Sequence, residues 1–135
     1  MRNLSPCWSF LLVVLVVHVA PIASARDREP QIRSVILPNG PDQVARPLYV
    51  AGEVATLLPF EGDVDPTRTK IAGWEGRFEP LGVAGHFVVV VPLYDLAPED
   101  RFPLVVTMMD GRQLPFTVTA AKAHVDHQVD LLWDP

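Results

Sequence analysis

The sequence predicts an all-β protein: a single immunoglobulin-like or fibronectin-like β-sandwich of short antiparallel strands that follows an N-terminal signal helix. Three observations lead to this class. Short runs rich in Val, Thr and aromatic residues recur with turn signals about every 8–12 residues. Fourteen prolines favour short elements, and helical signals are nearly absent before Ala120. About 110 mature residues suffice for one hydrophobic core and not for two, so we expect a single domain. We assign the sandwich to residues 32–120.

The first 25 residues have the three parts of a secretory signal peptide. Arg2 is the only charged residue before Arg26, and residues 8–19 form an apolar run. Ala23-Ser24-Ala25 then supplies the small residues that a signal peptidase reads, so we expect cleavage after Ala25. The alternative is an uncleaved anchor, but the run is shorter than the roughly 20 apolar residues that a spanning helix needs. The sequence therefore predicts a periplasmic or extracellular protein without membrane insertion after cleavage.

Cysteine content and charge restrict the mature chain further. Cys7 is the only cysteine and leaves with the signal peptide, so the mature domain has neither a disulfide nor a thiol. Removing Arg2 changes the balance of basic against acidic residues from 11 against 16 to 10 against 16, a net charge of −6. The basic residues are scattered, whereas phosphate neutralisation needs clustered Lys and Arg. We therefore expect no nucleic-acid partner.

The predicted strands follow a flexible lead-in over residues 26–31. Glu75-Gly76 is expected to join two of them as a turn, and a dense turn signal over residues 38–41 ends the first. Residues 87–91 are apolar at every position, which predicts a strand buried on both faces. N-terminal to residue 96, the expected strands are 32–37, 48–50, 54–60, 70–74, 77–81 and 87–91.

The pattern Leu96-x-Pro98-x-x-x-Phe102 precedes a strand with alternating apolar residues. It is similar to the corner that crosses between sheets in fibronectin-type and immunoglobulin-like domains. Those domains usually have Tyr at the aromatic position, whose hydroxyl bonds to the backbone. Phe102 keeps the packing surface and lacks the hydroxyl. We expect the chain to pass from one sheet to the other here.

Asp110-Gly111 is typical of a two-residue hairpin turn, but the apolar pattern favours a three-residue loop over residues 109–111. The shorter loop would direct the apolar residues of the two strands to opposite faces. The longer loop puts them on one face and places Gly111 at the left-handed position of a bulged turn. It pairs Val106 with Leu114 and Leu104 with Phe116.

In that register Pro103 and Pro115 face outward. Because proline cannot donate a hydrogen bond to a neighbouring strand, at least one of the two strands is expected at a sheet edge.

Residues 121–135 are expected to form a C-terminal tail, or a truncated further element, outside the sandwich. This segment contains the one metal-like cluster, His124, Asp126 and His127. On a helix the two histidines would share a face, and two histidines with one carboxylate can bind zinc when a fourth ligand completes the tetrahedron. His86 is the only distant ligand that suggests itself. A solvated chain end is the simpler interpretation, so we predict no metal and no cofactor.

No arrangement for catalysis is found. Ser34 is the only serine after residue 25, and it lies in a predicted strand without a Gly-x-Ser-x-Gly setting. A phosphate-binding loop is absent. Glu61, Asp63 and Asp65 alternate as in some calcium loops, but the remainder of that pattern is missing, which indicates a solvated turn. We expect a protein that is not an enzyme.

Several runs occur in the order typical of a known family: Gly73–Pro80, Val91–Phe102, Asp110-Gly111 and Val125–Val129. They resemble a paralogous Myxococcus family of uncharacterised exported proteins, catalogued as a domain of unknown function. The resemblance covers most of residues 30–130. It implies a Gram-negative source and export, and it implies no activity, because none is established for the family. Family members continue beyond the last of these runs, so the resemblance also implies a truncated or minimal member.

These observations predict a non-enzymatic binding or structural module of the cell envelope, acting through contacts with another envelope protein. One alternative is a metal-binding protein that uses His124 and His127. A second is a carbohydrate-binding module, for which an exposed Trp74 or Trp133 would supply the aromatic platform.

Overall fold

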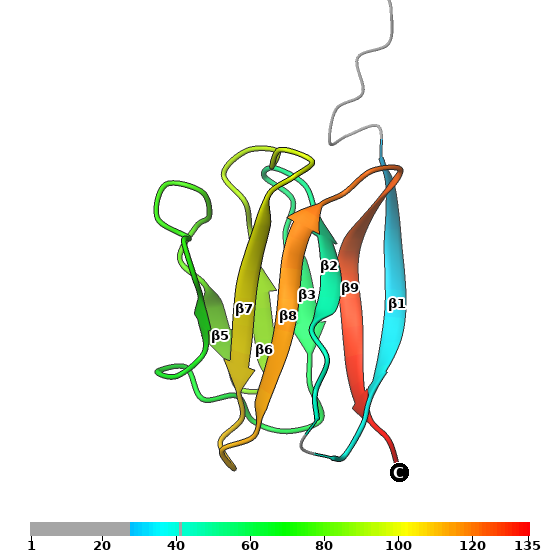
Figure 1. Cartoon of the computed structure of the whole chain (residues 1–135), viewed down its shortest axis with the longest axis vertical. Coiled ribbons are helices and arrows are strands. Elements are labelled where there is room, and N and C mark those ends of the chain that lie inside the picture. Colours follow the sequence, from blue (N-terminus) through cyan, green and yellow to red (C-terminus); the bar gives the residue numbers. More distant parts are fainter. Residues whose placement is uncertain (1–27, 41) are drawn as a thin grey trace, which may run out of the picture.

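Two mixed β-sheets pack face to face in this protein (Figure 1). The computed structural model describes residues 28–40 and 42–135, and within them nine strands and no helix are present. The expected β-sandwich is therefore confirmed, whereas the expected signal peptide over residues 1–25 lies outside the described residues. The strand order does not show an immunoglobulin-like topology.

The larger sheet, called sheet A, has five strands in the order β1-β9-β3-β6-β5, and sheet B has four in the order β2-β8-β7-β4. Their bounds in sheet A are β1 (Glu29–Leu37), β9 (His124–Trp133), β3 (Thr56–Pro59), β6 (Phe87–Val90) and β5 (Gly82–Ala84). In sheet B they are β2 (Arg46–Val50), β8 (Gln113–Ala120), β7 (Arg101–Thr107) and β4 (Lys70–Ile71).

The expectation of antiparallel strands is wrong for three pairs. Strand β9 is parallel to both β1 and β3, and β2 is parallel to β8. Only the β5–β6 and β7–β8 connections stay within one sheet, and both of these pairs are antiparallel. The other connections cross between the sheets, so consecutive strands need not be neighbours and parallel pairs result.

The β7–β8 hairpin has the predicted three-residue loop. Leu104 pairs with Phe116 and Val106 pairs with Leu114, and all four side chains are buried. Gly111 adopts a φ of +95° and donates its N–H to the Met108 carbonyl at 2.9 Å. This confirms that the apolar residues on the two sides of the loop line one core.

Side chains of both sheets fill that core. The largest fully buried ones are Leu58 and Leu131 of sheet A and Leu48, Leu104, Leu114 and Phe116 of sheet B, together with Met108 beside the hairpin loop.

The corner is also where it was predicted, because residues 91–100 connect β6 of sheet A to β7 of sheet B. Phe102 packs its ring edge-on against Phe78 at a centroid distance of 5.0 Å.

Both ends of the described chain differ from expectation. Glu29, Pro30 and Gln31 belong to β1 and are not a flexible lead-in. Residues 124–133, expected in a tail, form the ten-residue strand β9 between β1 and β3. Val125, Val129 and Leu131 of this strand are buried, and the burial of their apolar surface holds it in the sandwich.

Three of the expected strands between residues 70 and 91 were also misjudged. Strand β6 alternates, with Val88 and Val90 buried but Phe87 and Val89 only half-buried, so it is not enclosed on both faces. The expected strand over 70–74 shortens to β4, and 77–81 forms no strand, whereas β5 follows it. The reason is the turn after β4, where Gly73 has a φ of +74°.

The outward prolines do not place β7 or β8 at a sheet edge, because both strands have neighbours on each side. Each proline instead lies one residue beyond the pairing of the neighbouring strand. Strand β4 pairs with Leu104 and Val105 and does not extend to Pro103. Strand β2 begins its pairing at Phe116, one residue after Pro115.

Candidate functional site: a groove along β4

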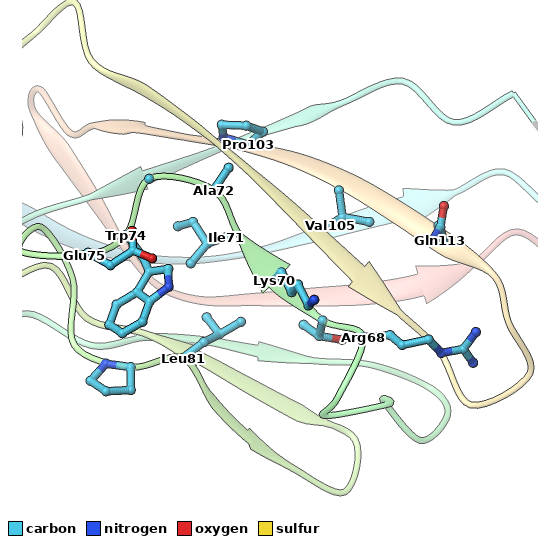
Figure 2. Close-up of a pocket in the computed structure, with 13 residues that line it drawn as sticks. Arg68, Lys70, Ile71, Ala72, Trp74, Glu75, Leu81, Pro103, Val105 and Gln113 are labelled. Carbon is cyan, nitrogen blue, oxygen red and sulfur yellow. The ribbon is translucent and has the colours of Figure 1, made fainter.

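A groove of about 870 Å³ runs along β4, at the side of the sandwich where both sheets end in short strands (Figure 2). We call it the β4 groove. Figure 2 shows Trp74 and Leu81 on one side of the β4 ribbon and Pro103 and Val105 on the other. Its apolar lining consists of Ile71, Ala72, Trp74, Pro80, Leu81, Pro103 and Val105, and its polar lining includes Arg68, Lys70, Glu75 and Gln113.

A tight turn after β4 positions Trp74. The Trp74 carbonyl accepts hydrogen bonds from the N–H groups of Arg77 and Phe78, both at 2.9 Å. Phe78 is buried against Phe102, and the N–H of Glu79 donates to the Val91 carbonyl at 2.9 Å. The loop that carries Trp74 is therefore fixed to the core, although the indole itself is only half-buried.

The edge of β4 is open toward the groove. The N–H of Ala72 donates to the Pro103 carbonyl at 3.0 Å, so Ala72 directs its backbone groups toward β7. Because backbone groups alternate in direction along a strand, those of Ile71 point away from β7. An edge with free backbone groups can pair with an additional strand.

Two basic residues at the start of β4, Arg68 and Lys70, line the groove. Lys70 is exposed and forms no ion pair with any residue of the described chain. The Arg68 guanidinium is held by Asp65, with 2.8 Å between Nε and Oδ2. The hydrogen bond from Arg68, followed by those from the Thr67 hydroxyl and backbone, lowers the pKa of Asp65 to about 2. The groove therefore combines apolar walls, two cations and an open strand edge.

The predicted metal candidates are not brought together. His124 and His127 lie in strand β9 and not on a helix, so the expectation of a shared helical face is wrong. The His124 imidazole is exposed with its Nε2 3.3 Å from Glu29 Oε2. His86 lies beside Phe87 near the Glu61–Asp63 loop. Residues 28–40 and 42–135 contain no group of three His, Cys, Asp or Glu side chains close enough to hold a metal.

Asp126 instead belongs to a buried ion pair on the opposite side of the sandwich. Its side chain has no exposed surface, and its two oxygens accept from Arg33 Nε at 2.9 Å and Arg33 Nη2 at 2.8 Å. Gln31 Nε2 donates to the same carboxylate at 2.7 Å, and the backbone N–H of Tyr49 does so at 2.9 Å. The hydrogen bonds to Asp126 raise the pKa of the Arg33 guanidinium. We call Asp126, Arg33, Gln31 and Tyr49 the Asp126 cluster.

The Asp126 cluster closes the edge of β2. Arg33 Nη2 also donates to the Pro47 carbonyl at 2.6 Å, so a donor and an acceptor of this edge strand are both satisfied by side chains of sheet A. A bulge makes this possible, because Gln31 pairs with Asp126 and Ile32 with Gln128, leaving His127 as the extra residue. Sequence reasoning missed Arg33 and treated Asp126 as a metal candidate.

The aromatic residues proposed for carbohydrate binding are both half-buried. The Arg112 guanidinium carbon lies 3.7 Å from the centroid of the Trp133 ring and covers one of its faces. Trp74 lines the β4 groove. Of the acidic residues in the 61–65 loop, Asp65 accepts hydrogen bonds from Thr67 and forms an ion pair with Arg68.

Residues 28–40 and 42–135 include no helix with the length and apolar character that a membrane span requires. None of the curated proteins matches the chain. A protein family does match, over residues 15–135, and its description is protein of unknown function, DUF2381. This agrees with the expected domain-of-unknown-function family, and the match includes every strand of both sheets. The chain therefore belongs to the DUF2381 family.

Proposed function

We propose that this chain is an exported, non-enzymatic module of the cell envelope that binds an extended segment of another envelope protein in the β4 groove. The observation that carries the proposal is the combination of an apolar groove with the open edge of β4. An extended segment can add backbone hydrogen bonds along such an edge while its alternate side chains enter the apolar lining. β-Sandwiches, including immunoglobulin-like ones, commonly use loops and edges in this way.

The charge of the groove indicates which side chains a bound segment should have. Arg68 and Lys70 line the same groove as Ile71 and Trp74, so the segment that fits places an apolar residue against the indole and a carboxylate toward the cations. The scattered distribution of the remaining basic residues supports a protein partner over nucleic acid. The signal-like N-terminus and the resemblance to exported myxobacterial proteins support a location in the periplasm or outside the cell.

The metal-binding alternative has less support, because the Asp126 carboxylate is occupied by Arg33 and Gln31. The carbohydrate-binding alternative would use Trp74 and therefore the same groove. A competition experiment separates it from the protein-binding proposal.

Site-specific photo-crosslinking tests the proposal. A photoreactive residue at Val105, in the groove, should capture a defined envelope protein in living cells of the source organism, whereas the same residue at the exposed Val44 should not. Trp74→Ala in the Val105 variant should abolish the adduct. Equal capture at Val44, or an adduct that survives Trp74→Ala, contradicts the proposal. Loss of the adduct on addition of envelope oligosaccharides would favour the carbohydrate-binding alternative instead.

Export is tested separately by the mass of the purified protein. The N-terminal residue should be Arg26, as expected for cleavage after Ala25. An intact N-terminus in the membrane fraction would contradict export with cleavage.

A further inference from the structure

Strand β1 is a long edge strand, and no other strand of the described residues pairs with its outer side. It has nine residues, whereas the edge strands β2, β5 and β4 have five, three and two. Glu29 donates its N–H to the Ala123 carbonyl, and the Leu37 carbonyl accepts from Asp134 N–H, so the odd-numbered residues direct their backbone toward β9. The even-numbered residues Ile32, Ser34 and Ile36 therefore direct theirs away from the sheet.

The same even-numbered residues present an apolar surface. Ile32 is 70% exposed and Ile36 is 52% exposed, with the exposed Ser34 between them. The only contact described for the backbone of these three on its outer side is a long hydrogen bond of 3.4 Å from Arg46 to the Ile36 carbonyl. A bonding edge that is both apolar and open is uncommon in natural proteins unless something pairs with it.

We propose that two copies of this chain pair through β1, antiparallel and related by a two-fold axis at Ser34. In this register Ser34 lies opposite Ser34 of the second copy, and Ile32 lies opposite Ile36 of the second copy. Each copy donates the N–H groups of Ile32, Ser34 and Ile36, three per copy and hence six hydrogen bonds in the pair. The four isoleucines form two cross-strand apolar pairs on one face. This inference is independent of the β4 groove, which lies at the other edge.

The edge is complementary to itself in this register and not in the adjacent ones. A register centred on Arg33 sets two guanidinium groups opposite each other and places Pro30 where an N–H must donate to Ile36. A register centred on Val35 places Pro38 at such a position. Only the register centred on Ser34 pairs the two prolines with each other, at the ends of the ladder.

Self-complementarity favours a second copy over an unrelated strand, because a two-fold interface requires one patch that matches itself. One strand pair is a small contact compared with the interfaces of permanent dimers. The dimer should therefore be weak and form reversibly as the protein concentration rises.

Sedimentation velocity of the exported, purified protein across a concentration series tests the proposal. The wild-type chain should shift from monomer to dimer. Ser34→Lys and Ser34→Glu should each raise the dimer dissociation constant by about tenfold or more, because like charges then meet on the two-fold axis. Mixing these two variants should restore dimers, since opposite charges face each other in the mixed pair.

Val44→Lys is the matched control, because Val44 is 72% exposed and lies outside β1, and it should leave the dissociation constant unchanged. Circular dichroism establishes that each variant is folded. A wild-type chain that stays monomeric up to its solubility limit overturns the proposal. So does a dimer that Ser34→Lys leaves intact, or one that the mixture of Ser34→Lys and Ser34→Glu fails to restore.

Discussion

The two lateral sides of the sandwich end in different ways. At one side β1 and β9 of sheet A lie beside β2 of sheet B (Figure 1). The side chains of the Asp126 cluster join these strands. At the other side the short strands β4 and β5 end the two sheets and leave the β4 groove. At the first side a charged pair satisfies the backbone of the edge strand β2, while the outer edge of β1 stays exposed. At the second side the edge of β4 and the apolar side chains of the groove are accessible.

This difference indicates a division of roles. A buried carboxylate is tolerated only when its hydrogen bonds are complete, and Asp126 has donors on β1 and β2 for both oxygens. Such a site stabilises one arrangement of the sheets and offers nothing to a ligand. The groove has the opposite character, because half-buried apolar side chains such as Trp74 and Leu81 are available for contact. We therefore expect substitutions at the two sides to affect different measurements.

The largest effect is expected for Asp126→Ala. It leaves Arg33 without its carboxylate and the Tyr49 N–H without an acceptor, so the free energy of unfolding should fall by about 3 kcal/mol. Urea denaturation followed by circular dichroism measures this loss. The control is Asp130→Ala in the same strand. Within residues 28–40 and 42–135 its carboxylate accepts only from Gln128, and the substitution should cost no more than about 0.5 kcal/mol. Similar losses for both variants would show that the Asp126 cluster does not close this side.

Gly52→Ala should be the next most severe, at about 2 kcal/mol. A Cβ at Gly52 would lie 2.5 Å from the Asp95 nitrogen and from the Tyr94 carbonyl carbon, and backbone atoms cannot yield as a flexible side chain can. The Asp95 carboxylate also accepts from the N–H of Gly52 at 2.8 Å and from Arg28 at 3.1 Å, so this contact links the end of β2 to the start of β1.

Gly40→Ala serves as the control for Gly52→Ala in thermal unfolding. Apart from its chain neighbours, no atom of the described residues lies within 4 Å of a Cβ at Gly40, so this substitution should be neutral or slightly stabilising. A melting temperature that is unchanged in Gly52→Ala would mean that the two loops are not in contact.

At the open side, Trp74→Ala should change stability less and binding more. The indole is half-buried against the core, so its removal should cost about 1–2 kcal/mol, well below the cost of a fully buried tryptophan. Capture of the partner through Val105 should nevertheless be lost. Asp126→Ala, studied at a temperature where it remains folded, should retain capture. Capture that is retained in Trp74→Ala and lost in folded Asp126→Ala would contradict the roles assigned to the two sides.

The sequence predicted the part of the fold that depends on local pattern. The β7–β8 hairpin was predicted in the correct register, because alternation of apolar residues and the need for glycine at position 111 both act within about 20 residues. Strand β9 was missed because its residues His124, Asp126 and His127 suggest a solvated chain end. The groups that make Asp126 tolerable in a strand lie far away in sequence, at separations of 93 residues for Arg33 and 77 for Tyr49.

The groove was beyond prediction for a related reason. Its lining comes from the segment around β4, the loop after it, and strands β7 and β8, so no single stretch of sequence describes it. Trp74 was considered as an exposed platform, but its half-buried position depends on the turn at Gly73 and on Phe78 packing into the core. Strand β5 was missed because Gly82-Val83-Ala84 is too short to show a period.

The smallest effect concerns the cationic end of the groove and its dependence on pH. Arg68 and Thr67 lower the pKa of Asp65 from 3.8 to about 2. Because the pKa in the folded protein lies below the unfolded value, this stabilisation is fully present above about pH 4 and is lost as the pH falls through 2. Over that interval Arg68 loses the carboxylate that positions its guanidinium, so its positive charge is no longer held in one place.

Carbon-13 NMR of the side-chain carboxyl groups measures this titration directly. The Asp65 resonance should have its midpoint near pH 2 in the wild-type protein and near its ordinary value in Arg68→Ala, because the hydrogen bond from Arg68 is the largest cause of the lowered pKa. A wild-type midpoint at the ordinary value would show that Asp65 does not hold Arg68 at the groove. The positive charge of the open side would then be as mobile as any surface side chain, and only the apolar lining would be preorganised for a partner.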